Sequence, residues 1–429
     1  MAGATDLGRD GGNHHQSGAA DAGGLAPVTV LPNAEWRTRP GLRRIVAALS
    51  ADGDTVKIVG GAVRDTLLGL AVSDIDMATP LLPDEVMRRL TAADIKVIPT
   101  GIAHGTVTAI ASGDHHEITT LRRDVETDGR RATVAFADDW REDAARRDFT
   151  INALYADPET GAVDDWFGGL ADLAAGRVAF IGDAATRIAE DHLRILRFYR
   201  FAARFGRGEL DAVSHDAVIA ARQSLKSLSR ERIADELLKI LALPDPRAIV
   251  GQMATDGIFE VLLPELDADF AAVFDRLLAN ETETAVEPAS LRRLSALLPA
   301  DPAIAEQVAS RLRLSTRQKK HLAAIARHRS DIVRPARQLA HAIGTDGARD
   351  IRLLSGDRAS ARAAVDALDG WEVPALPLKG GDIVARGVTV GPDVARILKA
   401  VEAAWVAEDF PGAARAAELA DQMIGRTSD

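Results

Sequence analysis

The stretch that most constrains the fold is residues 56–79, VKIVGGAVRDTLLGLAVSDIDMAT. Residues 56–59 form an apolar run with the length and composition of a β-strand. Gly60 and Gly61 end that strand, and the residues up to 68 predict a short helix. We expect a second strand to carry Asp74 and Asp76, and because side chains alternate across a strand, both carboxylates point to one face. The stretch therefore predicts a strand, a helix and a strand with two acids side by side.

This arrangement predicts a site for phosphate and metal ions. Two neighbouring carboxylates repel each other unless a cation lies between them. Mg²⁺ prefers oxygen ligands, and two such ions about 3.5–4 Å apart can stabilise a displacement at phosphorus. The Gly60-Gly61 turn offers backbone N–H groups at a helix N-terminus, which suit phosphate oxygens. Either motif alone is common in proteins without this function, but their order and spacing make the combination specific.

The same motifs carry a family resemblance. GGAVRDTLLG followed by SDIDMAT resembles the head motif of the nucleotidyltransferase superfamily that includes DNA polymerase β. Within it, the chain looks most like the class II tRNA nucleotidyltransferases, the bacterial CCA-adding enzyme and poly(A) polymerase family. RRDFTINAL at residues 146–154 resembles the family's second motif, and LSRERIADELLKIL at residues 228–241 resembles its fifth. The resemblance covers roughly residues 30–415.

The resemblance implies a CCA tRNA nucleotidyltransferase. Such an enzyme adds CCA to the tRNA 3′ end from CTP and ATP without a nucleic-acid template, and two Mg²⁺ ions assist the transfer. Three alternatives stay open: a poly(A) polymerase, an enzyme that adds only C or only A, and a catalytically silent RNA-binding paralogue. PTGIAHGTV at residues 99–107 resembles a segment of the CCA-adding members, which favours CCA addition over poly(A) addition.

The expected fold class is α+β. At 429 residues the chain exceeds a single typical core, and its low aromatic content of 4% with abundant Ala and Leu favours helix packed on helix. By resemblance, a small mixed β-sheet forms a nucleotidyltransferase head, followed by an all-α elongated neck, body and tail. We expect a disordered N-terminal tail at residues 1–28, the head at 29–165, the neck at 166–243, the body at 244–335 and the tail at 336–429.

Charge and composition limit the partners. A net charge of −11 argues against indiscriminate coating of nucleic acid, but local patches matter more than the sum. Residues 194–207 and 311–329 hold many Arg and Lys and no acid. The chain has no cysteine, which excludes disulfides, zinc–thiolate sites and thiol catalysis and fits a cytoplasmic protein. No apolar run reaches the ~20 residues of a membrane span, so no membrane partner is expected, and no protein partner is implied.

A third carboxylate is expected at the metal site. Glu117 falls on the second of two alternating strand patterns in GIAHGTVTAIASGDHHEITTLR, residues 101–122. The resemblance places the family's acidic strand residue here, so Asp74, Asp76 and Glu117 are the expected catalytic metal ligands; a surface Glu on an edge strand is the alternative. Residues 123–143, which follow, are polar without a lasting period and predict a mobile functional loop.

RRDFTINAL predicts contacts with the triphosphate. It begins with paired arginines, and guanidinium groups match phosphate oxygens. The resemblance assigns contacts with the triphosphate and sugar to Arg147 and Asn152. Gly61 in the glycine turn and Arg64 after it are further expected nucleotide contacts, because backbone N–H groups and a guanidinium suit phosphate oxygens. Asp148 is an alternative cap for a helix that follows.

EDHLRILR at residues 190–197 predicts nucleotide selection. On one helix Asp191 and Arg194 would be neighbours, and an intrahelical salt bridge is the commonest meaning of this spacing. A carboxylate can instead accept from the exocyclic amine of C or A while an arginine donates to the adjacent ring nitrogen, and U and G present the opposite polarity. The resemblance identifies this pair as the protein template for nucleotide choice, and Arg197 is a further expected nucleotide contact.

Basic residues further along the chain predict RNA contacts. Arg200 and Arg204 continue the basic face of the same helix and suit RNA phosphates. RLRLSTRQKKHLAAIARH, residues 311–328, predicts a basic helical hairpin that binds the RNA backbone through Arg317, Lys319 and Lys320, with a solvated basic face as the alternative. By resemblance, the C-terminal tail contacts the outer corner of tRNA.

Overall fold

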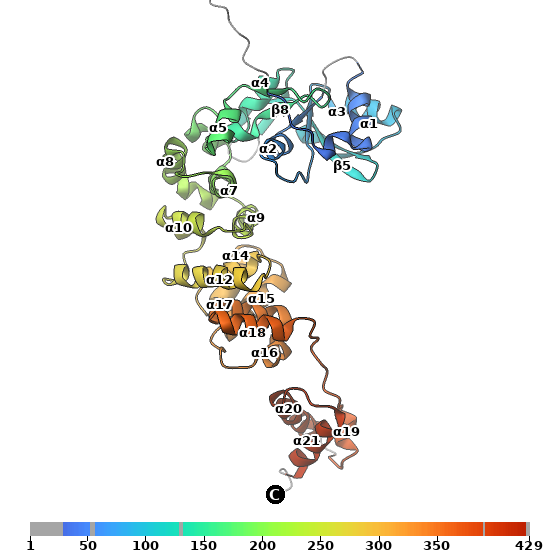
Figure 1. Ribbon diagram of the computed structural model, residues 1–429, viewed down its shortest axis with the longest axis vertical. Coiled ribbons are helices and arrows are strands. Elements are labelled where there is room, and N and C mark those ends of the chain that lie inside the picture. The colour runs from blue at the N-terminus through green and yellow to red at the C-terminus, as the bar shows by residue number, and fades with distance from the viewer. Residues whose placement is uncertain (1–28, 52–55, 128–131, 389–390, 426–429) are drawn as a thin grey trace, which may run out of the picture.

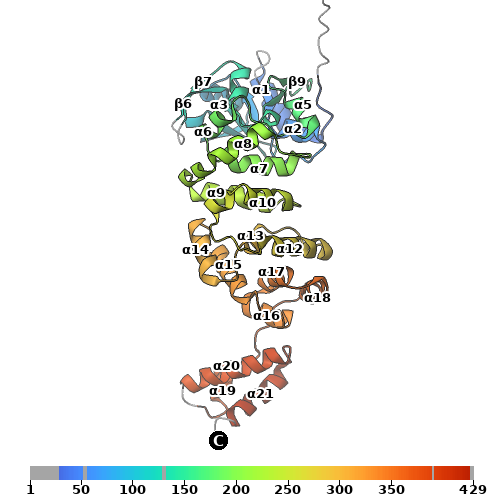
Figure 2. The same cartoon turned by 90° about the vertical axis from the view of Figure 1, so that its left-hand side faces the viewer.

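The computed structural model describes residues 29–51, 56–127, 132–388 and 391–425, and these form an elongated molecule. A sheet-containing head lies at one end, and layers of helices are stacked from it to the C-terminus (Figures 1 and 2). The expected α+β class, with a mixed sheet followed by an all-helical region, is confirmed. The expected N-terminal tail at residues 1–28 lies outside the described residues. None of the described helices is both long and apolar enough to cross a membrane.

The head is built on a mixed sheet. Seven strands of the described chain pair in the order β3-β4-β5-β2-β1-β8-β9, in which only β2 and β5 run parallel. This order puts the first two strands, from the motif around the glycine pair, in the middle of the sheet. The strands are β1 (Lys57–Val59), β2 (Met77–Thr79), β3 (Lys96–Gly101), β4 (Thr106–Ala111), β5 (Asp114–Thr120), β8 (Leu154–Ala156) and β9 (Val163–Asp165).

Helices cover the head sheet and bury its apolar side chains. In α1, Leu42, Ile45, Val46 and Leu49 recur at helical spacing, and this face packs on β4 and α3. The short helix after the glycine pair, α2, lies against β1 and β8 instead. The helical segments of the head are η1 (Glu35–Thr38), α1 (Pro40–Leu49), α2 (Gly61–Leu67), α3 (Pro83–Ala92), η2 (Ile102–His104), α4 (Trp140–Ala145), η3 (Thr150–Asn152) and α5 (Gly169–Ala175).

Two local expectations for the head are wrong. The strand expected to carry the two acids begins only at Met77, and Asp74 and Asp76 lie in the extended segment before it. The loop expected at residues 123–143 contains a two-stranded hairpin, β6 (Arg122–Thr127) and β7 (Ala132–Phe136), and then α4. An irregular register between Asp124 and Glu126 interrupts the alternation by which a strand is recognised, and Asp139 starts α4 by accepting a hydrogen bond from the Arg141 N–H.

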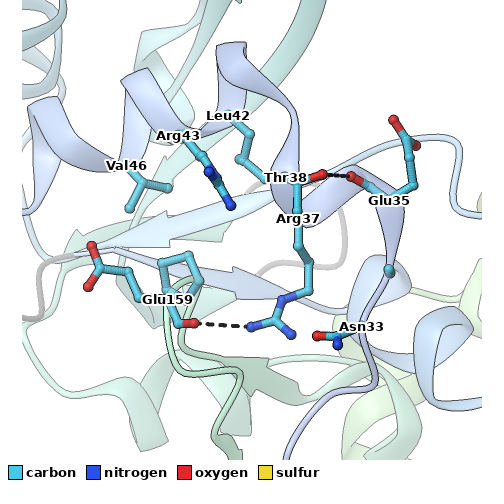
Figure 3. A pocket seen from close by; sticks show the side chains of 10 residues that line it. Asn33, Glu35, Arg37, Thr38, Leu42, Arg43, Val46 and Glu159 are labelled. Atoms are coloured by element: carbon cyan, nitrogen blue, oxygen red, sulfur yellow. Dashed lines mark hydrogen bonds between the residues drawn. The ribbon is translucent and has the colours of Figure 1, made fainter.

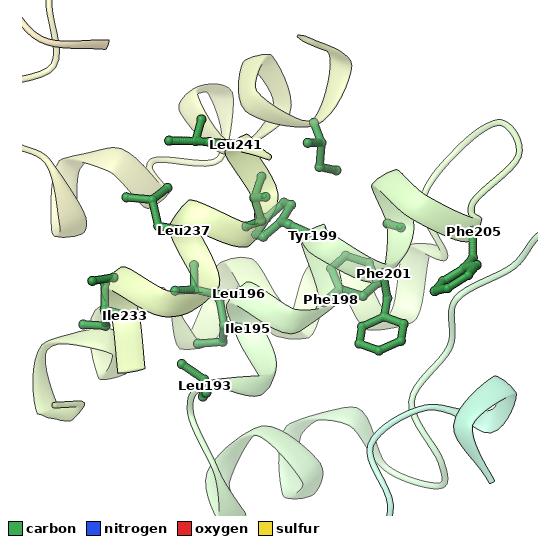
Figure 4. Close-up of a cluster of buried hydrophobic side chains, with 14 of the residues drawn as sticks. Leu193, Ile195, Leu196, Phe198, Tyr199, Phe201, Phe205, Ile233, Leu237 and Leu241 are labelled. Atoms are coloured by element: carbon green, nitrogen blue, oxygen red, sulfur yellow. The ribbon is translucent and has the colours of Figure 1, made fainter. Parts of the chain in front are cut away.

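The helices after the head begin with a neck whose centre is apolar. In α7 (Arg194–Phe205), side chains at helical spacing are buried against α9 (Arg230–Leu241), as Figure 4 shows for Leu196 and Leu237. The helix α9 begins directly after Ser229 and covers most of the segment that resembles the family's fifth motif. The other helical segments of this region are α6 (Ala184–Glu190), α8 (Ala212–Ala221), η4 (Arg222–Ser227), α10 (Arg247–Thr255) and α11 (Ile258–Leu262).

A buried ion cluster joins the neck to the next layer. Arg293 is 1% exposed, binds Glu281 at 2.8 Å and donates to the Leu241 carbonyl at the end of α9 at 2.7 Å. Arg292 binds the other oxygen of Glu281 and Asp350. The layer contains α12 (Phe270–Thr284), α13 (Ser290–Leu297), α14 (Pro302–Arg311), α15 (Thr316–His328), α16 (Ala336–Ile343), α17 (Thr345–Ser355) and α18 (Arg358–Leu368). The basic hairpin expected within residues 311–328 has other bounds: this segment holds the last residue of α14, a turn and α15, so α15 is its one helix and α14 before it supplies the other arm.

The C-terminal helices have their own core. Ile383, Ile397, Val401, Trp405 and Leu419 form a hydrophobic cluster separate from the large one that runs from the head through α18. The helices of this unit are α19 (Gly380–Val384), α20 (Gly391–Ala407) and α21 (Ala413–Gly425). The helices α17 and α18 pack on α12, and α16 packs on α17 and α18. Although His341 of α16 also touches Trp405 of α20, the buried side chains of α16 to α18 belong to the large cluster, so we propose that the tail begins near residue 370 and not at residue 336.

Candidate active site

The three expected metal ligands lie on one face of the head sheet. Asp74 and Asp76 are exposed, whereas Ile75 between them is 3% exposed, so the two carboxylates point the same way. The parallel pairing of Met77 with Ile118 sets Asp76 beside Glu117, which is also exposed. Glu117 is distant from Asp76 in the sequence, and the pairing of β2 with β5 brings the two acids together.

The electrostatics of Asp76 show that these acids act on one another. Although Asp76 keeps contact with solvent, desolvation by the surrounding protein atoms raises its pKa, the negative charges of Glu117 and Asp74 raise it further, and Arg147 acts in the opposite direction. Within the described residues, no three His, Asp or Glu side chains are close enough to form a preassembled metal site. The acids therefore form an open, repulsive group that a cation would stabilise.

The glycine turn lies next to the same arginine. Gly60 has a φ of +70°, a backbone conformation that residues other than glycine rarely adopt. A Cβ at this position would lie 3.5 Å from Nη1 of Arg147. The Gly60 N–H donates to the Leu154 carbonyl, and the Gly60 carbonyl accepts from the Arg64 N–H in the first turn of α2. Gly61 begins α2 beside this turn. The backbone of the turn is thus fixed by β8 on one side and α2 on the other.

Arg147 is held by two side chains that the sequence did not indicate as site residues. Its Nε donates to the Tyr155 hydroxyl at 2.9 Å, and its Nη2 lies 3.3 Å from Oδ2 of Asp143. The Tyr155 hydroxyl donates to the same Asp143 oxygen at 2.5 Å. Burial opposes the charge of Arg147, but Tyr155 and Asp143 outweigh it and raise the pKa of Arg147. The four-residue spacing from Asp143 to Arg147 is the signal that could have found this ion pair.

Arg64 does not lie open to the acidic face. It is 5% exposed, donates to Oδ1 of Asn152 at 2.5 Å, and stacks on Phe205 of α7 with its guanidinium carbon 4.1 Å from the ring centroid. Burial lowers the pKa of Arg64, and the Asp65 carboxylate, 2.7 Å from its Nε, partly compensates. The structure therefore places Arg64 in the joint between head and neck.

The same joint contains a chain of hydrogen bonds through Asp148. Asn152 donates to Oδ1 of Asp148 at 3.0 Å, and Arg197 of α7 donates to Oδ2 through Nε at 2.7 Å. Asp148 also accepts from the N–H of Phe149 at 2.8 Å, so it does not cap a following helix as the alternative expected. Burial raises the pKa of Asp148, but Arg197 and these hydrogen bonds more than reverse this and lower it.

The next two arginines of α7 also bind protein carboxylates. Arg200 donates to Oε2 of Glu236 at 2.6 Å, and Arg204 lies 3.3 Å from Oδ2 of Asp65. The acidic partners of these arginines are 36 and 139 residues away along the chain, so no local pattern reveals them. The sequence alone therefore indicated RNA phosphates as the partners of both arginines. In the structure they join α7 to α9 and to α2.

The expected helical pairing of Asp191 with Arg194 is wrong. The helix α6 ends at Glu190 and α7 begins at Arg194, so Asp191 lies between two helices and has an extended backbone conformation. Its carboxylate accepts from the Leu193 N–H at 3.1 Å and from Nη2 of Arg232 at 2.7 Å. Arg194 binds Oε2 of Glu190 at 2.7 Å and donates to the carbonyls of residues 187 and 146. Three acceptors leave two of the five guanidinium N–H groups for another partner.

The expected RNA-binding lysines and arginine divide between two surfaces. Arg317 and Lys320 line a groove of ≈ 1240 Å³ between α13, α15 and the start of α17. Arg327, which belongs to the same basic segment but was not among the expected contacts, and Arg349, which lies outside it, line the groove as well. Lys319 is turned toward α14 instead, where it donates to Oγ of Ser310 at 2.9 Å.

Another cavity, of ≈ 750 Å³, lies beside η1 and α1 and contains none of the expected site residues (Figure 3). Arg37 points across it and donates to the Glu159 carbonyl at 3.3 Å and to the Leu31 carbonyl at 3.3 Å. These bonds hold the turn after β8 against η1, so the visible role of Arg37 is structural.

Comparisons with known proteins agree with this architecture. Residues 56–179 match the Poly A polymerase head domain, and residues 209–270 match the probable RNA- and SrmB-binding site of polymerase A. The chain is 30% identical over 386 residues to the mitochondrial CCA tRNA nucleotidyltransferase 1 of Mus musculus, covering 85% of this chain and 86% of that protein. It is 38% identical over 235 residues to the CCA-adding enzyme of Leuconostoc citreum, covering 54% of this chain and 53% of that protein.

Solved structures give the same result. The CCA-adding enzyme of Bacillus stearothermophilus in complex with CTP superposes with a TM-score of 0.73 at 26% identity, covering 91% of this chain and 100% of that one. The Thermotoga maritima CCA-adding enzyme complexed with tRNA has a TM-score of 0.68 at 20% identity, covering 93% of this chain and 100% of that one, and shares the fold.

Proposed function

The chain belongs to the family of CCA tRNA nucleotidyltransferases, and we infer from this that it adds CCA to the 3′ end of tRNA from CTP and ATP without a nucleic-acid template. The RNA 3′ hydroxyl attacks the α-phosphate of the nucleotide, and pyrophosphate leaves. The observation that carries this proposal for the present chain is the single exposed face shared by Asp74, Asp76 and Glu117 beside the glycine turn.

We propose that Asp74, Asp76 and Glu117 hold two Mg²⁺ ions. All three offer only oxygen ligands, which Mg²⁺ prefers, and a cation would relieve the repulsion that raises the pKa of Asp76. Because the described carboxylates do not by themselves form a closed ligand set, each ion would need further ligands, which substrate phosphates can supply. When bound, Mg²⁺ lowers the pKa of an attacking hydroxyl and neutralises charge on the phosphates.

We propose that Arg147 and the backbone N–H of Gly61, at the start of α2, bind the triphosphate. The proposal rests on the contact between Arg147 and the turn, and on the fixed guanidinium that Asp143 and Tyr155 provide. These groups act on any nucleoside triphosphate, so they contribute to rate without choosing the base.

For Arg64 we propose an indirect role. Its burial and its hydrogen bond to Asn152 support a model in which Arg64 orients Asn152 toward the nucleotide sugar. The Asp148–Arg197 ion pair fixes Asn152 from the other side. Arg197 would then influence the nucleotide through Asp148.

Nucleotide choice is proposed for Asp191 and Arg194. The Asp191 carboxylate can accept from the exocyclic amine of C or A, and Arg194 keeps two N–H groups for the ring nitrogen beside it. U and G present an acceptor where C and A present the amine, and a donor where C and A present the ring nitrogen, so that donors face donors and acceptors face acceptors. The free-energy cost of these unpaired groups is large enough to reject U and G.

Binding of tRNA requires contacts beyond the head, and we propose the groove of Arg317 and Lys320 as one of them. Several cations lie in one groove on the side of α15, which suits the regularly spaced phosphates of an RNA strand. Lys319 lies outside this groove and would contribute through its charge alone.

A cytoplasmic location is also a proposal, because the cysteine-free sequence fits a reducing compartment. Two relatives are named as mitochondrial proteins of mouse and human, so the compartment calls for a direct measurement. Fluorescence of the tagged full chain should be even through the cytoplasm, and accumulation in an organelle would contradict the proposal.

Single-nucleotide incorporation tests the function. Transcripts of tRNA ending before CCA, after C and after CC are incubated with Mg²⁺ and one nucleotide at a time. The expected result is C on the first two ends, A on the third, and neither U nor G on any. Addition at only one step would make the chain a partial adder, and no addition on any end would favour a silent RNA-binding paralogue.

A further inference from the structure

The two residues proposed to read the base are kept apart by separate sets of partners. Opposite charges at positions 191 and 194 would ordinarily attract each other. The Asp191 carboxylate, however, is bound through Oδ1 by the Leu193 N–H and through Oδ2 by Arg232. Arg194 is bound by Glu190 and by two backbone carbonyls. Neither side chain therefore uses its hydrogen bonds on the other.

Arg232 reaches Asp191 from a different helix. It lies in the first turn of α9, 41 residues further along the chain, and its ion pair with Asp191 measures 2.7 Å. Its neighbours on α9 fix its backbone, because Ile233 is fully buried and Glu236 binds Arg200 of α7 at 2.6 Å. Figure 4 shows this end of α9, at Ile233, facing the start of α7. The guanidinium itself stays accessible, with 45% of the side chain exposed.

The bond leaves room for a base. An ionised carboxylate has roughly four acceptor positions, and the Leu193 N–H and Arg232 occupy two of them on Asp191. An incoming exocyclic amine can take a third without displacing either donor. Two anchored oxygens also fix the plane of the carboxylate, which a freely rotating side chain would not.

We propose that Arg232 is a positioning residue for nucleotide choice, which holds the Asp191 carboxylate away from Arg194 so that one group accepts from the base and the other donates to it. This inference rests on the proposed roles of Asp191 and Arg194. Without Arg232, the carboxylate would be free to turn toward Arg194, three residues further along the chain, and a direct bond between the two would consume both base-reading groups. Among the described residues the side-chain partner of Arg232 is Asp191, and not one of the proposed metal or triphosphate ligands, so its effect should fall on selection.

The test compares the catalytic efficiency for CTP and for UTP on a tRNA transcript ending before CCA. Arg232→Ala should lower the ratio of kcat/KM for CTP to that for UTP by about tenfold, the scale of one disrupted hydrogen-bond arrangement. Arg232→Lys, which keeps the charge, should recover most of the ratio. Arg313→Ala is the matched control, because Arg313 forms an exposed ion pair at 2.9 Å with Glu231, the residue that precedes Arg232. It should leave the ratio unchanged.

Asp191→Ala separates this inference from the function on which it rests. If Asp191→Ala loses selection while Arg232→Ala keeps the CTP to UTP ratio within about twofold, the proposal for Arg232 is overturned and the template role stands. An equal fall for all nucleotides in Arg232→Ala would also overturn it, because a structural support affects every substrate alike. If Asp191→Ala retains selection, the proposed template itself is wrong. Should Arg232→Ala fail to fold, Arg232→Met, which keeps the apolar stem, gives the same readout.

Discussion

Arg197 of the neck donates to Oδ2 of Asp148 in the head, and this ion pair connects the two parts of the molecule at the proposed nucleotide site. Asp148 in turn accepts from Asn152, the residue proposed to contact the sugar. The joint between head and neck and the nucleotide site therefore share one carboxylate, and a change in one affects the other.

Breaking this pair should destabilise the protein and weaken nucleotide binding together. Removing one partner of a buried ion pair costs about 3–5 kcal/mol, so Asp148→Asn should lower the free energy of unfolding on that scale and raise the KM for CTP and ATP. Chemical denaturation and steady-state kinetics measure the two effects. Lys239→Ala, which removes an exposed pair with Asp235, should change stability by less than about 1 kcal/mol. Unchanged stability in Asp148→Asn would contradict the role of the pair.

The loss of stability caused by Asp148→Asn should depend on pH. Because the pKa of Asp148 is lowered in the folded state, its carboxylate contributes stability that is present above the ordinary Asp pKa of about 3.9 and is lost as pH falls through the folded value. The difference in unfolding free energy between the wild type and Asp148→Asn should therefore be constant from neutral pH down to about pH 4 and shrink below it. A difference that grows in acid would show the opposite shift.

Tyr155→Phe should weaken binding of every nucleotide equally. It removes the hydroxyl that accepts from Arg147 and donates to Asp143, so the guanidinium loses its orientation, and we expect KM for CTP and ATP to rise by about tenfold. Tyr199→Phe is the matched control, because its hydroxyl also donates to a buried carboxylate, Asp256, at 2.7 Å. The control should lose similar stability without the change in KM. An effect of Tyr155→Phe on one nucleotide alone would place Arg147 at the base and not at the triphosphate.

Substitution of the acidic face should abolish chemistry without unfolding the protein. Asp74→Asn and Asp76→Asn should each reduce incorporation by about a thousandfold or more. Because desolvation and then the charges of Glu117 and Asp74 raise the pKa of Asp76, removal of its charge should leave thermal stability unchanged or increase it. Asp114→Asn, on β5 and 3.9 Å from Arg39, should retain activity. Substantial activity in either of the first two variants would refute their assignment as metal ligands.

The groove on the body predicts a salt-dependent decrease in tRNA affinity when its cations are removed. Arg317→Ala and Lys320→Ala together should weaken tRNA binding and reduce the slope of log Kd against log salt concentration by about 1 for each phosphate that is no longer neutralised. Lys319→Ala should have a smaller effect, since Lys319 lies outside the groove. Filter binding at several salt concentrations distinguishes these results, and an equal effect of all three would mean that the groove has no special role.

Much of the fold follows from local patterns. The periodicity of Leu42, Ile45 and Leu49 gives α1, and the periodicity of Ile233, Leu237 and Ile240 gives α9. The hairpin of β6 and β7 could not be predicted because its register shift destroys the alternation on which such an expectation depends. The break between α6 and α7 was missed for a related reason. The helical spacing of the sequence continues through Asp191, but the helix itself is interrupted there.

The site was predictable where its residues are close in sequence, and less so where they meet through the fold. The acids at 74 and 76 and the glycine turn occur in one motif, whereas Arg232 and Asp191 are 41 residues apart and no pattern connects them. The basic row of α7 was expected to face RNA, and only the structure shows Arg200 against Glu236 and Arg204 against Asp65. Sequence shows which charges exist, and tertiary packing decides which of them remain available.

The measurement that tests the central claim most directly is the sequence of the product made from a tRNA transcript lacking CCA when all four nucleotides and Mg²⁺ are present. The proposed function predicts addition of C, C and A in that order, followed by arrest, although U and G are available. A tail of many A residues would show a poly(A) polymerase, and incorporation of U or G at these positions would contradict selection by Asp191 and Arg194.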